Sequence, residues 1–322
     1  MDAHWEVIIV GGGPAGLSAA LTLGRCRRRV LLCDAGTPRH WAAEEMHAFV
    51  TRDGIPPRRF RELAREELGR YPNVSLLDER VVSAERHDAS FAVETDAGRR
   101  STGRKLLLAT GLFDELPKLE GIEDFFGKSV FQCPYCDGWE MRERPIAVYG
   151  TGKRGLEMSR AMTAWADDIV WFTDGRSRVS RGDERALLRN GVAVRRERIR
   201  RLEGAGGRLR AVVLESGEAV PREALFFDTE SFQQSSLAAR LGCSFDKSGG
   251  VRCGKYEATD VPGVFVAGNI IKDVHLAIVA AAEGARAAMG INKALTREDF
   301  ERRDTGEPRL IHPDPEGALK RA

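Results

Sequence analysis

The sequence predicts an α/β protein in which a unit of strand, glycine turn, helix and strand occurs twice. The first unit opens at residues 6–10, a short apolar run that ends in glycines, and the second opens at residues 146–149. Short apolar runs closed by turn residues are typical of buried strands. The chain has 322 residues, and at ~150 residues per domain this length also favours two domains.

The remaining elements follow from the apolar pattern along the chain. In the first unit a helix passes through Leu17 and a strand follows at residues 30–33; a further strand covers 106–109. The second unit repeats this order, with strands at 146–149 and 169–172. A strand at 263–267 precedes a helix of small residues at about 274–289, and the proline-containing tail from residue 302 is expected to be an exposed extension.

Composition excludes several classes of protein. Fifty basic and forty-eight acidic residues give a net charge of +2, so no strong field attracts nucleic acid or an anionic membrane. No apolar run reaches the ~18 residues of a spanning helix, and the first strand begins too early to leave room for a signal peptide. We therefore expect a cytoplasmic protein without nucleic-acid or membrane partners.

The first glycine motif predicts a dinucleotide site. Gly11, Gly13 and Gly16 have the GxGxxG spacing, and Asp34 lies eighteen residues beyond the last glycine. Glycines at this spacing allow a tight turn, close approach of a pyrophosphate and tight packing of helix on strand. The helix N-terminus offers N–H groups to phosphate, and an acid after the second strand suits the ribose hydroxyls of adenosine.

The second glycine motif is less decisive about its ligand. Gly150, Gly152 and Gly155 repeat the spacing after a strand, and Asp174 closes the next strand. This acid suits an unphosphorylated ribose, whereas Arg176 could meet a 2′-phosphate. NAD(P)H is therefore a possible second cofactor, and a domain that has kept the fold without the ligand stays open as the alternative.

The third motif is a redox-type cysteine pair. Cys133 and Cys136 are separated by two residues, a spacing that allows a small disulfide ring, and Asp137 follows as a candidate proton donor and acceptor. Half of a zinc site is the alternative, but no second CxxC or paired histidine supplies the other ligands. Cys243 and Cys253 have no such spacing. We expect no metal site.

The histidines carry little signal. The six form no i, i+4 pair, and we interpret most of them, including His47, as surface or packing residues. His275 is the exception, for a reason given below.

Together these motifs resemble the bacterial-type, low-molecular-weight thioredoxin reductase family of FAD-dependent disulfide oxidoreductases. The resemblance spans residues 7–300 and rests on VIIVGGGPAG, KLLLATG, the CxxC followed by Asp-Gly, and GVFVAGN before a long helix. The segments CPYCDGWE and VAAAEGARAAMGINKAL resemble the branch of gliotoxin- and holomycin-type dithiol oxidases, which close disulfides in natural products.

The resemblance implies two Rossmann-like domains, each a three-layer sandwich with a parallel central sheet, the second inserted in the first. The FAD-binding domain would be split over 1–115 and 248–322. The NAD(P)-binding-like domain, 116–247, would carry the cysteine pair. Members of the family usually dimerise through the FAD domain, so a homodimer is expected.

The resemblance also assigns roles to individual residues. Cys136 would be the sulfur near the flavin, Cys133 the one that exchanges with substrate, and Asp137 the acid/base. The residues implied to hold FAD are Gly11, Gly13, Pro14, Ala15, Gly16, Asp34, Val82, Thr110, Gly111, Gly268, Asn269 and His275. Those implied to meet NAD(P) are Gly150, Gly152, Gly155, Asp174 and Arg176.

Three departures from the family pattern bear on function. Asn269 stands where the family usually has aspartate on the ribityl chain, and an amide can still hydrogen-bond there. His275 stands where the family often has glutamine; next to the flavin pyrimidine it would stabilise reduced, anionic flavin, and a purely structural role is the alternative. The His-Arg-Arg signature that reads the NADPH 2′-phosphate is absent from residues 172–176.

These features predict two-electron exchange between a dithiol or disulfide and FAD. The missing phosphate reader favours oxidation of a small-molecule dithiol with O2 as acceptor. The alternatives are an NAD(P)H-dependent thioredoxin reductase acting on a thioredoxin-like protein, a disulfide reductase with another donor such as ferredoxin, and a flavin-binding regulator without turnover. An acid beside the thiol pair argues against the last.

Overall fold

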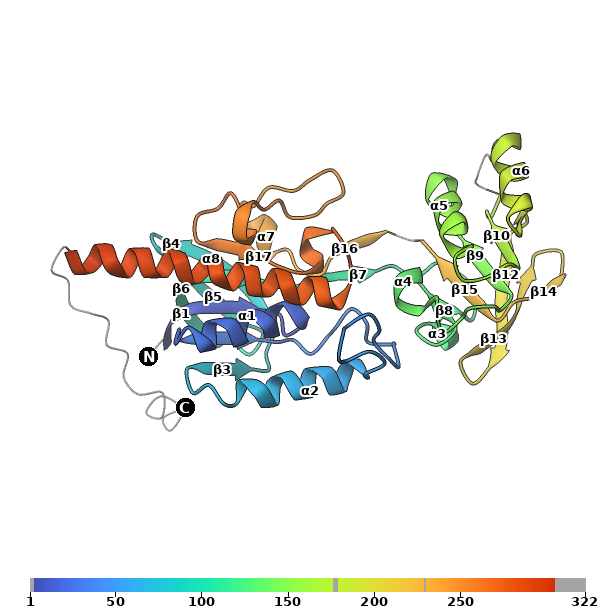
Figure 1. The fold of residues 1–322 in the computed structure, drawn as a ribbon. Helices are drawn as coiled ribbons and strands as arrows, with labels where there is room; N and C mark the ends of the chain where they lie inside the picture. Colours follow the sequence, from blue (N-terminus) through green and yellow to red (C-terminus); the bar gives the residue numbers. More distant parts are fainter. Residues whose placement is uncertain (1–2, 176–178, 229, 305–322) are drawn as a thin grey trace. The chain divides into compact units, whose positions relative to one another are not determined.

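The computed structural model describes residues 3–175, 179–228 and 230–304 (Figure 1). Contacts within the chain divide it into two compact units. Unit 1 consists of Met1–Arg39, Arg58–Phe113 and Phe232–Ala322, and unit 2 of His40–Pro57 and Asp114–Ser231. Unit 1 is thus assembled from three stretches of sequence.

The units differ from the sequence-based domain limits at two long segments and at residues 114 and 115, which belong to unit 2. Residues 232–247 belong to unit 1, because Leu237 and Ala238 are buried in its core. Residues 40–57 belong to unit 2, where Gly127 packs so closely on the loop that an added Cβ would lie 2.4 Å from the carbonyl oxygen of Ala42. Binding of FAD by unit 1 and of NAD(P) by unit 2 stays a prediction.

Unit 1 is built on a seven-stranded sheet of order β3-β2-β1-β6-β5-β4, with β17 also paired to β6. Strands β1, β2, β3, β6 and β17 run parallel, whereas β4 and β5 form an antiparallel extension. The strands are β1 (Ala3–Val10), β2 (Val30–Cys33), β3 (Val74–Leu77), β4 (Val81–His87), β5 (Ser90–Thr95), β6 (Arg100–Leu108) and β17 (Val264–Val266). The helices are α1 (Pro14–Arg25), α2 (Pro57–Leu68), α7 (Leu237–Arg240), α8 (Ala277–Asp304) and the 3-10 turns η1 (Lys255–Glu257) and η2 (Asn269–Ile271).

Strand β1 is buried on both faces, as the run of apolar residues predicts. Val7 and Ile9 pack into one core cluster with α1 and α8, while Ile8 and Val10 pack into a second cluster on the opposite face. The carboxyl ends of β1 and β2 therefore lie inside a rigid frame, and the loops that follow them are held in place.

Helix α8 lies against α1, and small residues allow the close approach (Figure 1). A Cβ added to Gly284 would lie 2.0 Å from the carbonyl oxygen of Ala15. The predicted helix at about 274–289 is therefore correct in kind but wrong in extent, since the helix runs from Ala277 to Asp304. Its additional turns bury Ile291 and Leu295 in the core.

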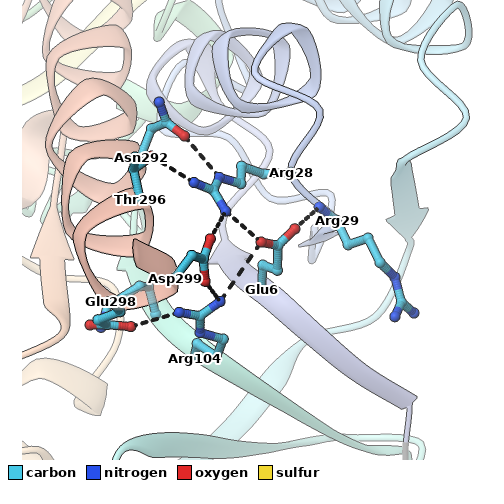
Figure 2. A network of polar contacts seen from close by, with 9 residues as sticks. Glu6, Arg28, Arg29, Arg104, Asn292, Thr296, Glu298 and Asp299 are labelled. Atoms are coloured by element: carbon cyan, nitrogen blue, oxygen red, sulfur yellow. Dashed lines mark hydrogen bonds and ion pairs between the residues drawn. The ribbon is translucent and has the colours of Figure 1, made fainter. Parts of the chain in front are cut away.

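A polar network fixes the last turns of α8 (Figure 2). Arg28 Nη1 lies 2.7 Å from Glu6 Oε1 and 2.7 Å from Asp299 Oδ2. Arg104 Nη1 lies 2.7 Å from Asp299 Oδ1, and its Nη2 lies 2.9 Å from Glu298 Oε2. Burial of Glu6 and Arg104 is offset here by mutual pairing, as buried charges require.

Unit 2 is built on a five-stranded parallel sheet of order β11-β10-β9-β15-β8. Its strands are β8 (Val130–Phe131), β9 (Ile146–Tyr149), β10 (Ile169–Phe172), β11 (Val192–Arg195) and β15 (Ala224–Phe227). An antiparallel sheet adds β12 (Ile199–Ala205), β13 (Arg208–Leu214) and β14 (Ala219–Pro221). The helices are α3 (Ile122–Phe125), α4 (Pro134–Asp137), α5 (Gly152–Met162) and α6 (Arg181–Arg189).

The short strands β7 (Leu112–Asp114) and β16 (Ser231–Gln233) pair where the chain passes between the units. The α/β class and the parallel sheets predicted from the sequence are confirmed, and the strands expected at 146–149 and 169–172 have those bounds. Among the described residues, no helix has the length and apolar character needed to cross a membrane.

Candidate active site

The cysteine pair of unit 2 forms a disulfide at the start of a single helical turn. Cys133 and Cys136 are bonded, with their Cα atoms 5.2 Å apart. Cys133 precedes α4, and its carbonyl accepts the backbone N–H groups of Cys136 and Asp137, each at 3.1 Å. The backbone therefore holds both sulfurs and the neighbouring carboxyl in one turn. The other described cysteines, Cys26, Cys33, Cys243 and Cys253, are free thiols.

A tryptophan that the sequence did not identify braces this turn. An added Cβ on Gly138 would lie 2.5 Å from the carbonyl oxygen of Pro134 and 2.8 Å from the ring of Trp165. Trp165 also meets Tyr135 edge to face, with ring centroids 5.8 Å apart. The Asp-Gly sequence after the pair is thus explained by packing, because only glycine fits beneath the indole ring.

Exposed aromatic side chains flank the disulfide. Tyr135, between the two cysteines, is 72% exposed, and Trp139 is 64% exposed. The guanidinium of Arg142 lies over the Trp139 ring at 4.1 Å. Large apolar side chains left in water next to a reactive group are typical of binding surfaces.

Asp137 has the electrostatics of an acid/base group. Burial raises the pKa of this carboxyl to about 7; His47, when protonated, acts against the rise, and Glu140 adds to it. A carboxyl that titrates near neutral pH can both donate and accept a proton at physiological pH. The acid/base role of Asp137 stays a prediction, and the raised pKa supports it.

His47 and Glu140 were not singled out by the sequence. His47 lies 90 positions before Asp137 in the chain, and no local pattern links the two. In the structure its side chain is 15% exposed and Nε2 lies 3.7 Å from Glu140 Oε1. The interpretation of His47 as an ordinary surface or packing histidine therefore misses a charge contact close to the disulfide.

The first glycine turn, in unit 1, leaves its backbone open to a ligand. Gly11 has φ +114°, and an added Cβ would lie 2.2 Å from the carbonyl oxygen of Ala109. Gly13 has no atom within 4 Å of the corresponding position, and as the residue before α1 it makes no side-chain cap. Pro14 begins α1, and buried Ala15 and Gly16 follow in its first turn. Uncapped N–H groups at an open helix N-terminus suit a phosphate.

Asp34 follows β2 and is already engaged by the protein. Its Oδ1 accepts the backbone N–H groups of Gly12 at 3.3 Å and Gly36 at 3.1 Å. Its Oδ2 pairs with Arg61 and lies 3.7 Å from Arg65, both on α2. The sequence located this carboxylate beside the glycine turn but gave no sign of its arginine partners.

Several further residues predicted for FAD converge on the same end of the unit 1 sheet. Thr110 follows the Ala109 that packs on Gly11, and its Oγ1 is buried with no hydrogen-bond partner among the described residues. Gly111 has φ +69° and open space around it. Gly268 has φ +80°, and an added Cβ would lie 3.0 Å from the Cβ of Ala15.

Asn269, His275 and Val82 occupy different surroundings. Asn269 begins η2 directly after Gly268, whose N–H donates to buried Glu283 Oε2 at 2.7 Å. His275 lies in the segment before α8, two residues ahead of the helix. Val82 sits at an irregularity of the β4–β5 ladder, and its carbonyl accepts a 3.2 Å hydrogen bond from Arg240.

These residues of unit 1 fit the adenosine diphosphate half of FAD. The orphaned Thr110 hydroxyl, the positive φ of Gly11 and the space at Gly13 form one cradle at the carboxyl ends of β1 and β6. Ligands of open α/β sheets bind at this edge.

The second glycine turn, in unit 2, repeats the packing of the first. A Cβ on Gly155 would lie 2.6 Å from the carbonyl oxygen of Gly150, and Gly152, with φ +60°, has open space around it. Asp174, after β10, is buried with φ +54°, and the hydroxyl of Tyr149 lies 3.5 Å from its Oδ2. Arg176 lies outside the described residues, as do Arg178 and the tail beyond residue 304.

Comparison with known proteins supports this interpretation. The family described as "Pyridine nucleotide-disulphide oxidoreductase" matches residues 5–284. A protein of Arthroderma benhamiae named "Probable thioredoxin reductase" is 36% identical over 180 residues, which is 54% of this chain but only 45% of that protein. "Thioredoxin reductase tcpT" of Claviceps purpurea is 32% identical over 276 residues, covering 82% of this chain and 86% of its own length.

Among solved structures, the crystal structure of HlmI superposes with a TM-score of 0.90 at 33% identity. The match covers 94% of this chain and 96% of HlmI. The fold of this chain is thus shared with a known structure over nearly the whole length of both.

Proposed function

Because the chain belongs to the pyridine nucleotide-disulphide oxidoreductase family, we propose that it oxidises a small-molecule dithiol to a disulfide with O2 as final acceptor. That it is a flavin-dependent oxidoreductase acting on sulfur groups follows from the family; the direction and the substrate are the proposal. The observation that carries it is the disulfide of Cys133 and Cys136, flanked by exposed Tyr135 and Trp139.

The cysteine pair performs the exchange with substrate. A substrate thiolate attacks Sγ of Cys133, the bond between the two cysteines breaks, and Cys136 leaves as a thiolate with the bonding electron pair. The second substrate thiolate attacks the substrate sulfur of the mixed disulfide, which forms the product disulfide and releases Cys133 as a thiolate. Asp137 accepts a proton given up by the substrate thiols.

FAD, when bound, supplies the two-electron acceptor that lets the cysteine pair re-form its disulfide. We propose that Gly11, Gly13, Pro14, Ala15, Gly16, Asp34, Val82, Thr110, Gly111, Gly268, Asn269 and His275 hold it. The open backbone at Gly13 and the buried, unpartnered hydroxyl of Thr110 support this assignment.

A disulfide reductase driven by NAD(P)H is the second candidate. The open turn at Gly152 and the tight contact of Gly155 on Gly150 favour nucleotide binding by unit 2. Asp174 argues for a ribose without 2′-phosphate, because a buried carboxylate would repel a second anion. A reductase of this chain would therefore use NADH in preference to NADPH. A reductase fed by a non-nucleotide donor is the third candidate.

Anaerobic stopped-flow absorbance separates the candidates. The purified yellow protein is mixed with NADPH, NADH or dithiothreitol. Bleaching of the flavin band by dithiothreitol, followed by rapid recovery in air, is the expected result for a dithiol oxidase. Fast bleaching by a nicotinamide nucleotide would move the reductase ahead. Bleaching by none of the three, with reduction by ferredoxin, would favour the third candidate.

The variant Cys136→Ser tests the cysteine pair itself. It should retain bound flavin but lose dithiol turnover, whereas Cys26→Ser, at an exposed free thiol of unit 1, should retain both. Persistence of turnover in Cys136→Ser would remove the pair from the mechanism.

We also propose a cytoplasmic homodimer, on the resemblance described above. The four described free thiols suit a reducing compartment. Light scattering coupled to gel filtration tests the dimer.

A further inference from the structure

A loop far from the cysteine pair in sequence brings a histidine to it. Residues 40–57 belong to unit 2, together with the cysteine turn. The loop is closed on itself by the bridge of Met46 with Ile55, in which the Met46 N–H donates to Ile55 at 2.9 Å. The Ala48 N–H donates to Asp53 Oδ1 at 2.8 Å, which fixes the residue next to His47.

His47 is enclosed by carboxylates from two segments. Its Nε2 lies 3.6 Å from Glu45 Oε2 and 3.7 Å from Glu140 Oε1, and its Nδ1 lies 3.7 Å from Asp53 Oδ1. Glu45 and Asp53 are mostly exposed, whereas His47 is largely buried. An imidazolium at this place is therefore compensated on both ring nitrogens.

Glu140 joins this cluster to the acid/base group. It follows Asp137 by three residues, and its Oε2 is buried with no hydrogen-bond partner among the described residues. Two charged side chains act on the Asp137 carboxyl: His47, when protonated, lowers its pKa, and Glu140 raises it. The neighbouring Cys136 also acts on Asp137, because the proposed exchange releases Cys136 as a thiolate when the pair is reduced.

We propose that His47 is a positioning residue of the dithiol site, and that it places an ionisable positive charge beside Asp137 which the carboxylates of Glu45, Asp53 and Glu140 hold in place. The proposal rests on the proposed function, since it concerns the proton that the Asp137 carboxyl takes from the substrate thiol. His47 acts through Asp137, and its polar contacts are those with Glu45, Asp53 and Glu140.

The charges of His47 and Glu140 should displace the ionisation of Asp137 in opposite directions. Removing the positive charge of His47 makes Asp137 easier to protonate, so the midpoint of its ionisation should move to higher pH. Removing the negative charge of Glu140 should move the midpoint to lower pH. A mere loss of packing at His47 or Glu140 would not move the midpoint of Asp137 ionisation in opposite directions.

The experiment uses the flavin-loaded full chain and anaerobic reduction by dithiothreitol, followed at the flavin band from pH 5.5 to 9. The variants are His47→Gln, His47→Lys, Glu140→Gln and the control His87→Gln. His87 is an exposed histidine of unit 1 that lies 3.5 Å from Glu85. Bound flavin and melting temperature are recorded for each variant.

We expect the Asp137-dependent midpoint to rise by about one pH unit in His47→Gln, which lowers the rate about tenfold on the acid side. Glu140→Gln should move it downward, His47→Lys should not raise it, and His87→Gln should match the wild type. Midpoints of His47→Gln and Glu140→Gln that move together, or not at all, overturn the proposal. If His47→Gln fails to fold, a fixed or raised midpoint in Glu140→Gln alone overturns it.

If the proposed function is wrong, dithiothreitol does not reduce the flavin of the wild type at any pH. A wild type that is reduced with an Asp137-dependent midpoint, beside variants that leave this midpoint in place, refutes only the role of His47.

Discussion

Arg28 Nη1 lies 2.7 Å from Asp299 Oδ2, and this contact joins residues 271 positions apart in the sequence. Arg28 sits in the turn between α1 and β2, whereas Asp299 lies in the last turns of α8. Both side chains are mostly shielded from solvent. The last turns of α8 are thereby tied to the edge of the first βαβ unit.

The variant Asp299→Asn should lower the free energy of unfolding by about 2 kcal/mol, because hydrogen bonds between charged groups contribute roughly 1.5–3 kcal/mol. Urea denaturation measures it. The control is Glu301→Gln, whose exposed pair with Arg297 at 3.8 Å should contribute within about 0.5 kcal/mol. Equal losses in the two variants would contradict the argument.

Stability should also depend on pH through this network. Burial raises the pKa of Asp299, but the hydrogen bonds from Arg28 and Arg104 outweigh burial and hold the pKa below its usual value. A lowered pKa in the folded state stabilises the protein above the unfolded-state value of about 3.9 and loses this contribution as the pH falls through the folded-state value. The difference between wild type and Asp299→Asn should therefore vanish in acid.

Gly138→Ala should destabilise the cysteine turn by about 1–3 kcal/mol, because the new methyl group would overlap Pro134 and Trp165. Gly182→Ala is the matched control in unit 2. There the nearest atom, Ser180 Oγ, lies at an ordinary 3.6 Å, and a gain of roughly 0.4–1 kcal/mol is expected in a helix. Thermal unfolding of both variants decides whether the contact matters.

Thr110→Val separates binding of FAD from folding. Valine keeps the shape of threonine but removes the buried hydroxyl that has no partner among the described residues. The flavin-free protein should be at least as stable as the wild type, while the Kd for FAD should rise about tenfold, the loss of one hydrogen bond of ~1.4 kcal/mol. Titration of FAD into deflavinated protein measures this.

The control for Thr110→Val is Thr22→Val, since the Thr22 hydroxyl donates to the carbonyl of Ser18 within α1. An unchanged Kd in Thr110→Val would remove this hydroxyl from the cofactor site.

The ionisation of Asp137 should appear in the rate of dithiol oxidation. As the base that accepts the thiol proton, Asp137 must be ionised, so the rate should rise through the pKa of about 7 that burial imposes. Asp137→Asn should lose this limb and keep only the rise due to thiol ionisation. Asp228→Asn, where burial also raises the pKa of a unit 2 carboxyl, should keep the profile.

The same raised pKa predicts a cost in stability. The folded state binds the Asp137 proton more tightly than the unfolded chain, so stability falls as the pH rises from about 4 to about 7. Asp137→Asn should therefore melt higher than the wild type at pH 8 and close to it at pH 4. A lower melting temperature at pH 8 would show that burial does not govern this carboxyl.

The sequence predicts those parts of the site whose chemistry needs neighbouring residues. A glycine turn such as Gly11 to Gly16 is contiguous because the backbone itself meets the ligand, and Cys133 with Cys136 must be close to form one ring. Strands β9 and β10 are predictable because a parallel strand buried on both faces is apolar throughout.

The remaining parts depend on contacts between distant segments. Trp165 and His47 reach the cysteine turn only after folding, and Arg61 meets Asp34 across 27 positions. The antiparallel strand β5 has mixed polarity, since one of its faces is partly exposed, and no apolar run marks it. The predicted end of α8 at about residue 289 is too early, because beyond it apolar residues such as Ile291 and Leu295 are sparse and charged residues such as Glu298 and Asp299 hold the last turns.

Strand β17, which completes the sheet of unit 1 beside β6, comes from residues 264–266, and α8 follows it. During translation, residue 231 leaves the ribosome well before these segments, and with it the last stretch of unit 2. Since domains fold as units while the chain is made, the nascent protein acquires its folded cysteine turn while the cradle for the flavin still lacks a strand and its covering helix. A ribosome-bound chain can therefore exchange electrons with thiols before it can bind the flavin that would accept those electrons.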